Sequence, residues 1–299
     1  MLATRVSTIQ LQNPTILASG VLGSYGSSIR RVAEKGAAAV VTKSLGVEAR
    51  TGHNNPTVVE LEGALINAMG LPNPGYKAFG EEITAAKAGG RPIIGSAYGF
   101  SVEEYVEVAR GLEGYGVDGI ELNLSCPNVA DTGTEFGQDP ELCSAVVRAV
   151  KGAVKIPVFA KLTAEVGDIV EIAKACEEAK ADGVTAINTL RAMKIDVRVR
   201  TPALGNKTGG LSGPYIKPIA VRCVYEIAQE TDLDIIGCGG VSTGEDIAEF
   251  LMAGAKAVEI GTGVWLRGVG VFKKASEELE RFMQEYKYSS IEELVGAAL

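Results

Sequence analysis

The sequence predicts an α/β protein with a single (β/α)8 barrel domain, in which insertions lie above the C-terminal mouth. Three observations lead to this prediction. Short apolar or β-branched runs alternate with segments of helical spacing along nearly all of the 299 residues. Glycine, or Asp-Gly, stands between helix and strand in several of these units, where glycine can end a helix in a left-handed conformation. Such a barrel uses about 250 residues in one unit, and no tract rich in Pro, Ser or charge divides this chain.

Eight buried strands are expected, near residues 15, 39, 92, 119, 158, 183, 235 and 257. The repeated unit is clearest in residues 36–41, 116–122, 181–187 and 254–260, where a short apolar run follows a glycine. A continuous apolar run of this length suits a strand that is buried on both faces. Eight such units imply a closed parallel barrel whose site lies at the C-terminal ends of the strands.

Helical spacing separates the strands. A helix is expected from about residue 27 to residue 35, and residues 242–245 have the spacing of a capping box for a later helix. Residues 291–299 predict a short amphipathic helix. Three predicted apolar faces consist of Val102, Tyr105, Val106 and Ala109, of Ile169, Ile172, Ala173 and Cys176, and of Ile247, Phe250, Leu251 and Gly254.

Two segments, residues 45–74 and 189–217, are too long for ordinary loops. Each follows a predicted strand, so both are expected to lie over the mouth of the barrel. Residues 69–75 and 208–214 are rich in glycine and proline, which favours tight turns over disorder. We therefore expect the two insertions to wall a pocket.

Composition excludes several classes of function. The chain carries 29 Lys and Arg against 37 Asp and Glu, a net charge of −8, which argues against broad nucleic-acid binding. No apolar run approaches the roughly 18 residues of a membrane span, and the N-terminus lacks a signal pattern, so a cytoplasmic protein is expected. The five cysteines include no Cys-x-x-Cys pair, and the single His53 has no paired acid in its loop. These patterns predict reduced thiols and no metal site.

Polar residues stand at the ends of several predicted strands. They are Ser19, Lys43, Ser96, Asn123, Lys161 and Asn188. The barrel interior prefers branched apolar residues, although a lone lysine at a strand end is more often simply solvated. Because the strand ends converge in a barrel, the joint occurrence of two lysines and two asparagines predicts one shared site.

Residues 121–128 have the sequence Glu-Leu-Asn-Leu-Ser-Cys-Pro-Asn. A buried strand would not favour this mixture, because Pro lacks a ladder donor and each buried amide needs partners. Cys126 lies in a polar loop, where nearby amides or cations can let its thiol exchange a proton. The other cysteines, interpreted as inert residues on helices or at a strand end, are Cys143, Cys176, Cys223 and Cys238.

Glycine-rich turns end the seventh and eighth predicted strands, at residues 237–241 and 259–263. In barrels of this type these two loops commonly bind a phosphate through backbone N–H groups, and the alternative is two ordinary glycine turns. Leu266 stands where a dinucleotide fingerprint would place its third glycine. The pattern therefore favours a mononucleotide cofactor.

Nine motifs, in this order, make the chain similar to the class 1 dihydroorotate dehydrogenases, flavin enzymes that oxidise dihydroorotate to orotate in pyrimidine synthesis. The resemblance covers nearly the whole chain. The motifs are Ala-Ser-Gly at 18–20, Thr-Lys-Ser at 42–44, Asn-Ala-Met-Gly-Leu-Pro-Asn at 67–73, Asn-Leu-Ser-Cys-Pro-Asn at 123–128, Ala-Lys-Leu at 160–162, Ile-Asn-Thr at 187–189, Gly-Gly-Leu-Ser-Gly-Pro at 209–214, Gly-Gly-Val at 239–241 and Gly-Thr at 261–262.

The resemblance implies roles for individual residues. Cys126 would be the base that takes a proton from substrate C5 while a hydride passes from C6 to flavin N5, and Lys43 would also act in catalysis. Lys161 would stabilise negative charge on the reduced flavin. The implied substrate-binding residues are Lys43, Asn67, Met69, Gly70, Leu71, Asn123, Asn188 and Thr189. The implied FMN contacts are Ser19, Lys43, Ser44, Ser96, Asn123, Lys161, Ile187, Gly213, Gly239, Gly240, Gly261 and Thr262.

Residues 136–140 and 187–190 resemble the class 1B form most closely. The catalytic chain of that form passes electrons to a separate subunit that carries FAD and a [2Fe-2S] cluster, and then to NAD. The resemblance thus implies a homodimer at the core of a heterotetramer. The alternatives are a fumarate-linked class 1A enzyme, another FMN-dependent dihydropyrimidine or tRNA dihydrouridine enzyme, and a barrel without catalytic activity. Ser125 disfavours the tRNA enzyme, whose loop has glycine at that place.

Overall fold

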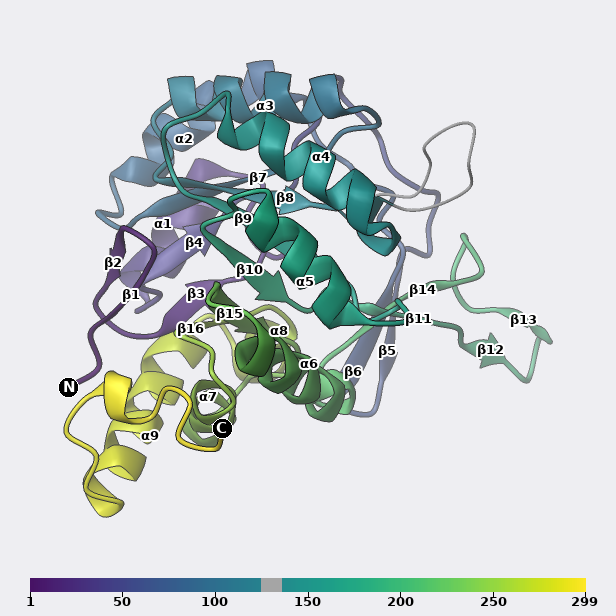
Figure 1. Cartoon of the computed structure of the whole chain (residues 1–299). Helices are drawn as coiled ribbons and strands as arrows, with labels where there is room; N and C mark the ends of the chain where they lie inside the picture. Colours follow the sequence, from purple (N-terminus) through teal and green to yellow (C-terminus); the bar gives the residue numbers. More distant parts are fainter. Residues whose placement is uncertain (125–135) are drawn as a thin grey trace.

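The computed structural model describes residues 1–124 and 136–299, and its centre is a closed barrel of eight parallel strands (Figure 1). The order around the barrel is β10-β15-β16-β3-β4-β7-β8-β9. All eight predicted strands and the (β/α)8 fold are confirmed. The strands are β3 (Thr15–Leu17), β4 (Ala39–Val41), β7 (Ile93–Ala97), β8 (Gly119–Asn123), β9 (Val158–Leu162), β10 (Gly183–Ala186), β15 (Asp234–Cys238) and β16 (Ala257–Ile260).

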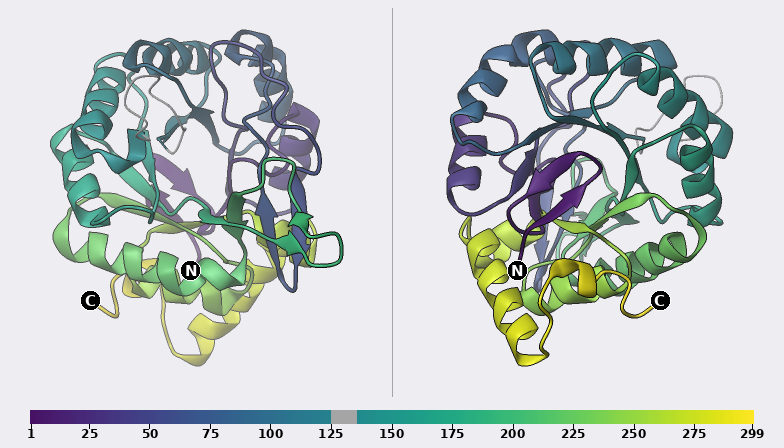
Figure 2. Two further views of the ribbon diagram at one scale, coloured as in Figure 1. Left: turned by 90° about the vertical axis from the view of Figure 1, so that its right-hand side faces the viewer. Right: turned by 60° about the vertical axis from the view of Figure 1, so that its left-hand side comes forward.

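Helices surround the barrel, and their apolar faces pack on the strands (Figure 2). The predicted face of Ile169, Ile172, Ala173 and Cys176 is buried throughout. A short extra helix, α8, follows the last barrel strand. The helices are α1 (Gly26–Glu34), α2 (Gly80–Lys87), α3 (Val102–Gly114), α4 (Pro140–Lys151), α5 (Ile169–Glu178), α6 (Lys217–Glu230), α7 (Gly244–Met252), α8 (Thr262–Arg267) and α9 (Val271–Glu285).

Three details of the helix predictions were wrong. The buried face of α3 continues through Val108 and Leu112, whereas Val102 and Val106 are only partly buried. The capping box of α7 lies one residue later than predicted, between Thr243 and Asp246. The predicted helix at 291–299 is a single 3-10 turn, η4 (Ile291–Glu293), followed by turns that include a glycine with φ of 73°. The other 3-10 turns are η1 (Tyr76–Phe79), η2 (Phe136–Gln138) and η3 (Pro214–Ile216).

The two insertions form strands, which the expectation of tight turns had missed. β5 (Val58–Leu61) and β6 (Ala64–Asn67) come from the first insertion, and β11 (Leu190–Ala192) and β14 (Gly209–Ser212) from the second. They pair in one antiparallel sheet in the order β11-β14-β6-β5. Figure 1 shows this sheet beside the C-terminal ends of the barrel strands. A hairpin of β12 (Ile195–Asp196) and β13 (Thr201–Pro202) projects beyond it (Figure 1).

An N-terminal hairpin crosses the opposite end of the barrel (Figure 2). It consists of β1 (Thr4–Val6) and β2 (Ile9–Leu11). Its buried side chains belong to one apolar cluster with barrel residues such as Ile94, Phe159 and Ile236. The cluster fills the lower part of the barrel, so polar side chains that point inward from the strands occupy the part nearer the mouth. Within residues 1–124 and 136–299, no helix is long and apolar enough to cross a bilayer.

Candidate active site

Hydroxyl and amide groups join the C-terminal ends of neighbouring barrel strands. Ser19, after β3, donates a hydrogen bond of 2.9 Å to the carbonyl oxygen of Thr42, and its Oγ lies 3.2 Å from Ser44 Oγ. Ser44 Oγ lies 2.9 Å from Ser96 Oγ on β7. It also accepts a hydrogen bond of 3.2 Å from Asn123 Nδ2 on β8. The structure thus brings Ser19, Ser44, Ser96 and Asn123 together; we call this the mouth network.

The mouth network continues into the insertion sheet. Asn188 Nδ2 donates to Asn123 Oδ1 at 3.4 Å, and Asn188 Oδ1 accepts from the backbone N–H of Thr189 at 2.7 Å. A Cβ at Gly210 would lie only 2.0 Å from Thr189 Oγ1, so this glycine lets β14 approach Thr189 directly. Asn67 Nδ2 donates to the Gly210 carbonyl at 3.3 Å. Asn67 and Thr189 therefore flank the same point of β14.

Three glycine-containing turns meet near this sheet. Thr262 Oγ1 donates to Ser212 Oγ at 2.7 Å. The carbonyl oxygen of Gly213 lies 2.9 Å from the place that a Cβ at Gly240 would take. Gly239 and Gly240 have φ angles of 138° and 82°, which side chains rarely adopt. A backbone cradle without side chains lets an anion approach closely, so the donor set fits a phosphate group.

Gly261 connects β16 to α8 and lies against the end of β3. A Cβ at Gly261 would make an ordinary contact of 3.4 Å with Ala18. Arg267, at the end of α8, forms an ion pair of 2.6 Å with Glu278, so its guanidinium is already neutralised. The cradle thus consists of backbone and hydroxyl groups.

Lys43 follows β4 and is only 8% exposed. Its backbone N–H donates to the carbonyl of Gly23 at 2.9 Å, so the loop after β4 is hydrogen-bonded to the loop after β3. Burial lowers the pKa of its ammonium. Among residues 1–124 and 136–299, no carboxylate forms an ion pair with Lys43. A buried cation without a counter-charge is costly, and an anionic ligand would remove that cost.

Lys161, by contrast, lies in a buried ion cluster inside the barrel. Its Nζ is 2.5 Å from Glu259 Oε2 on β16 and 3.5 Å from Glu121 Oε1 on β8. Thr185 on β10 donates a hydrogen bond of 3.0 Å to Glu121 Oε2. Glu121 and Glu259 are each 1% exposed. Two carboxyl groups therefore share one ammonium.

The charges of this cluster follow from its burial. Burial alone lowers the pKa of Lys161, but Cys238, Glu121 and Glu259 together raise that pKa above its ordinary value. Burial, and then repulsion by Glu259, raises the pKa of Glu121 well above its usual range. Burial also raises the pKa of the Cys238 thiol. Lys161 thus remains charged, while burial opposes the ionisation of Glu121 and of the Cys238 thiol.

The turn of residues 69–71 belongs to the first insertion and is held by Asn73. Gly70 and Leu71 have φ angles of 74° and 55°. Asn73 Nδ2 donates to the Leu71 carbonyl at 2.8 Å and to the Tyr98 hydroxyl at 2.9 Å. Asn73 Oδ1 accepts from two backbone N–H groups. The Met69 carbonyl accepts from the His53 N–H at 3.0 Å, so the turn is held by Asn73 and by the loop of His53.

Ile187 extends β10, and its backbone N–H donates to the Cys238 carbonyl at 2.7 Å. Its side chain is 1% exposed. Cys126, the predicted base, lies outside the described residues. The described chain on either side is joined by a hydrogen bond of 2.9 Å from the Gly137 N–H to the Leu124 carbonyl. Leu124 directly follows Asn123 of the mouth network.

Residues 1–283 match the sequence model of the family described as dihydroorotate dehydrogenase. The chain belongs to the dihydroorotate dehydrogenase family. Three relatives bear the name dihydroorotate dehydrogenase B (NAD(+)), catalytic subunit. That of Thermoplasma acidophilum is 50% identical over 298 residues, 100% of this chain and 99% of its own. That of Methanocaldococcus jannaschii is 50% identical over 302 residues, 100% and 98% of the two chains. That of Pyrococcus furiosus is 50% identical over 290 residues, 97% and 96%.

Sequence reasoning missed three residues that shape the mouth of this dihydroorotate dehydrogenase barrel. Glu121 and Glu259 hold Lys161, and Asn73 holds the turn of the first insertion. A signal for the two glutamates was present, because each interrupts an otherwise apolar run in a predicted strand. For Asn73 the sequence has a weaker signal, since an Asn between two prolines suits many turns.

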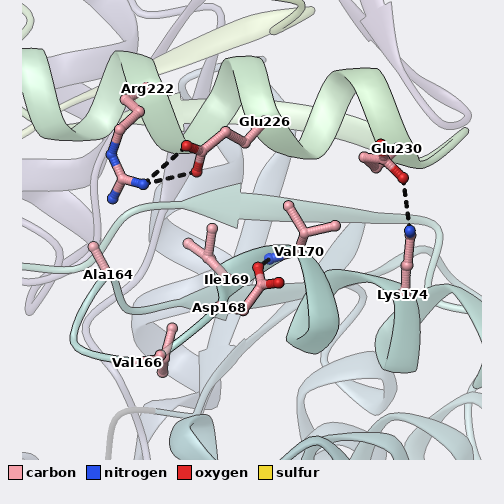
Figure 3. Close-up of a pocket in the computed structure, with 10 residues that line it drawn as sticks. Ala164, Val166, Asp168, Ile169, Val170, Lys174, Arg222, Glu226 and Glu230 are labelled. Carbon is pink, nitrogen blue, oxygen red and sulfur yellow. Dashed lines mark hydrogen bonds and ion pairs between the residues drawn. The ribbon is translucent and has the colours of Figure 1, made fainter.

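A hollow with a volume of about 440 Å³ lies between α5 and α6 (Figure 3). Its charged side chains neutralise one another. Lys174 pairs with Glu230 at 2.7 Å, and Arg222 pairs with Glu226 at 2.8 Å. Asp168 accepts a backbone hydrogen bond of 2.8 Å at the start of α5. Because these charges are already satisfied, we do not assign the hollow to the site.

Three thiols lie on helices, as predicted, and are buried: Cys143, Cys176 and Cys223. A hydrogen bond with Cys143, and then burial, raises the pKa of Cys176, and burial raises the pKa of Cys223 to about 11. Raised pKa values keep the thiols of Cys176 and Cys223 unreactive at neutral pH. The described part of this dihydroorotate dehydrogenase contains no cluster of three or more His, Cys, Asp or Glu side chains placed to share a metal ion.

Proposed function

We propose that this chain binds one FMN at the mouth of its barrel and oxidises dihydroorotate to orotate in the synthesis of UMP, as the catalytic subunit of an NAD-linked enzyme. The observation that carries the proposal is Lys43, a buried ammonium without a carboxylate partner among the described residues. It stands two residues after β4, directly before Ser44 of the mouth network. A planar anion with amide-like edges would meet both a cation and amide groups there.

Substrate recognition would combine charge and hydrogen bonds. Lys43 would bind the carboxylate, while Asn67, Asn123, Asn188 and Thr189 would bind the ring edges. Asn123 and Asn188 are already hydrogen-bonded to each other, which limits their rotation and fixes their free donors and acceptors. The turn of residues 69–71 would cover the substrate, with Asn73 holding it in place.

The FMN phosphate would bind in the backbone cradle of Gly213, Gly239, Gly240 and Gly261, with Thr262 as a hydroxyl donor. The cradle excludes side chains at its positive φ angles, which is what close approach of a phosphate requires. Ser19, Ser44 and Ser96 would bind polar edges of the flavin, and Lys161 would lie near the ring with Ile187 beside it. When bound, the flavin supplies the acceptor for the substrate hydride.

Cys126 would take the proton that leaves substrate C5. The assignment of Cys126 rests on the sequence, in which it follows Asn123 of the mouth network by three residues; amide groups and a cation near a thiol favour its thiolate. The chain would then transfer electrons to a second subunit that holds FAD and a [2Fe-2S] cluster. The relatives are named catalytic subunits of an NAD(+) enzyme, which supports substrate oxidation and electron transfer to NAD on separate subunits. We propose a homodimer of this single-domain chain at the core of a heterotetramer.

The decisive measurement is a visible spectrum with an activity assay. Purified protein loaded with FMN should be yellow, and dihydroorotate should bleach the flavin absorbance and yield orotate with an artificial electron acceptor. NAD should be reduced only after the partner subunit is added. A protein that cannot be loaded with FMN contradicts the proposal as a whole, whereas NADH formation by this chain alone contradicts only the two-subunit part.

Gly240→Ala tests the phosphate cradle. A side chain at φ of 82° is strained by about 1–2 kcal/mol, and the added Cβ would lie 2.9 Å from the Gly213 carbonyl oxygen. We expect the dissociation constant of FMN, measured by fluorescence quenching, to rise about tenfold or more. Gly90→Ala is the matched control, because Gly90 has φ of 65° and open space around it. Equal FMN affinity in the two variants would contradict the cradle.

A further inference from the structure

The cluster around Lys161 contains two carboxyl groups for one ammonium. Glu121 and Glu259 both approach its ammonium inside the barrel. Interiors of this kind are normally filled with branched apolar residues, and burial of charged groups costs about several kcal/mol per ion. An apolar residue in place of either glutamate would leave the buried ammonium of Lys161 with less counter-charge, so the two glutamates are explained by their effect on Lys161 rather than by packing.

Strand register shows how the cluster is oriented. Lys161 on β9 is aligned with Asn123, whereas Glu121 is aligned with Phe159, one layer deeper. Glu259 is aligned with Ile16, a member of the apolar cluster in the lower barrel. The ammonium therefore lies on the mouth side, and both carboxyl groups extend from deeper positions toward it.

The two glutamates are not equivalent. Glu121 receives a hydrogen bond from Thr185, and burial together with repulsion by Glu259 raises its pKa. Glu259 makes the shorter contact with Lys161, through Oε2. Its other oxygen, Oε1, is buried and has no hydrogen-bond partner among the described residues. The ammonium of Lys161 therefore makes its closer contact with Glu259, at 2.5 Å against 3.5 Å for Glu121.

We propose that Glu259 is a positioning residue that lowers the reduction potential of the bound flavin, because its carboxylate competes with the flavin for the ammonium of Lys161. The inference rests on the proposed function. Two-electron reduction adds negative charge to a flavin ring, and a lysine without a partner would stabilise that charge strongly. Because Glu259 partly neutralises Lys161, the reduced flavin is stabilised less and transfers its electrons more readily to the next carrier.

The test measures the midpoint potential of the FMN-loaded protein at neutral pH by spectroscopic titration against reference dyes. Glu259→Gln should raise the potential and slow reoxidation of the flavin by an artificial acceptor. Glu121→Gln alters the longer contact of 3.5 Å with Lys161, so its potential should rise less than that of Glu259→Gln. Glu230→Gln, which removes a carboxylate from an exposed pair with Lys174, controls for net charge.

Each outcome decides the inference. A potential of Glu259→Gln equal to or below that of the wild type overturns it, and so does an equal rise in Glu121→Gln. Should Glu259→Gln fail to fold, Lys161→Met decides instead: its potential should fall, and an unchanged or higher potential overturns the inference. If the wild type is yellow and oxidises dihydroorotate while these shifts are absent, only the role of Glu259 fails and the proposed function stands.

Discussion

Replacing Lys43 with alanine should lower kcat/KM for dihydroorotate by about 10²–10³-fold, a loss comparable to truncation of one partner of a buried, hydrogen-bonded charge pair. Lys43 is buried at the mouth and is paired with no carboxylate of the described residues. Its ammonium is therefore available to bind an anionic substrate. Most of the loss should be in KM, since the carboxylate is present in substrate and transition state alike.

The measurement uses FMN-loaded protein and an artificial acceptor, with flavin content checked for each variant. Lys174→Ala is the matched control, because Lys174 is an exposed lysine paired with Glu230 and should leave kcat/KM unchanged. A pH signature supports the assignment. Burial lowers the pKa of Lys43, so its ammonium loses the proton at a lower pH than an ordinary lysine, and substrate affinity should fall as pH rises through that value. Wild-type kinetics in Lys43→Ala would contradict the proposed substrate site.

Cys126→Ala should reduce turnover by about 10²–10⁴-fold, the usual contribution of a general base. The flavin should remain bound, because the glycine cradle proposed for its phosphate lies on other loops. Cys126→Ser should also be slow, since a hydroxyl is a much weaker acid than a thiol and is rarely deprotonated at neutral pH.

Rates of substrate-dependent flavin bleaching, measured by stopped flow, separate this step from later electron transfer. Cys223→Ala is the control: this thiol lies on α6, burial raises its pKa to about 11, and its removal should leave the bleaching rate unchanged. A bleaching rate of Cys126→Ala close to that of the wild type would remove Cys126 from the mechanism. Loss of bound flavin in that variant would instead show that the loop holds the cofactor.

Much of the barrel could be predicted because its signal is local. A buried parallel strand is a short apolar run, and a helix has a period of 3.6 residues, so each element is visible in its own segment. The run at 36–41, for instance, became β4 with all three residues buried. Element ends were less certain, as the capping box at Thr243 and the short turn at Ile291 show. There the outcome depends on single hydrogen bonds and on a glycine with positive φ.

The insertion sheet could not be predicted in the same way. Its strands are only three or four residues long, and β14 consists of Gly, Gly, Leu and Ser. Such a segment has little intrinsic preference for a strand. It becomes one because Asn67 and Gly210, which are 143 residues apart, meet across two insertions. Strand formation here follows from the closed barrel, which brings the two loops to the same edge.

The sequence by itself determined the barrel, its eight strands and the polar residues at their ends, and its motifs indicated the family. Only the tertiary structure decided which of those residues are already paired. Lys43 and Lys161 both stand in short motifs at strand ends, yet Lys161 is held by carboxylates 40 and 98 residues away while Lys43 has no such partner in the described chain. Charge pairing depends on distance in space, and in a barrel that distance is set by strand order and register, which no local pattern contains.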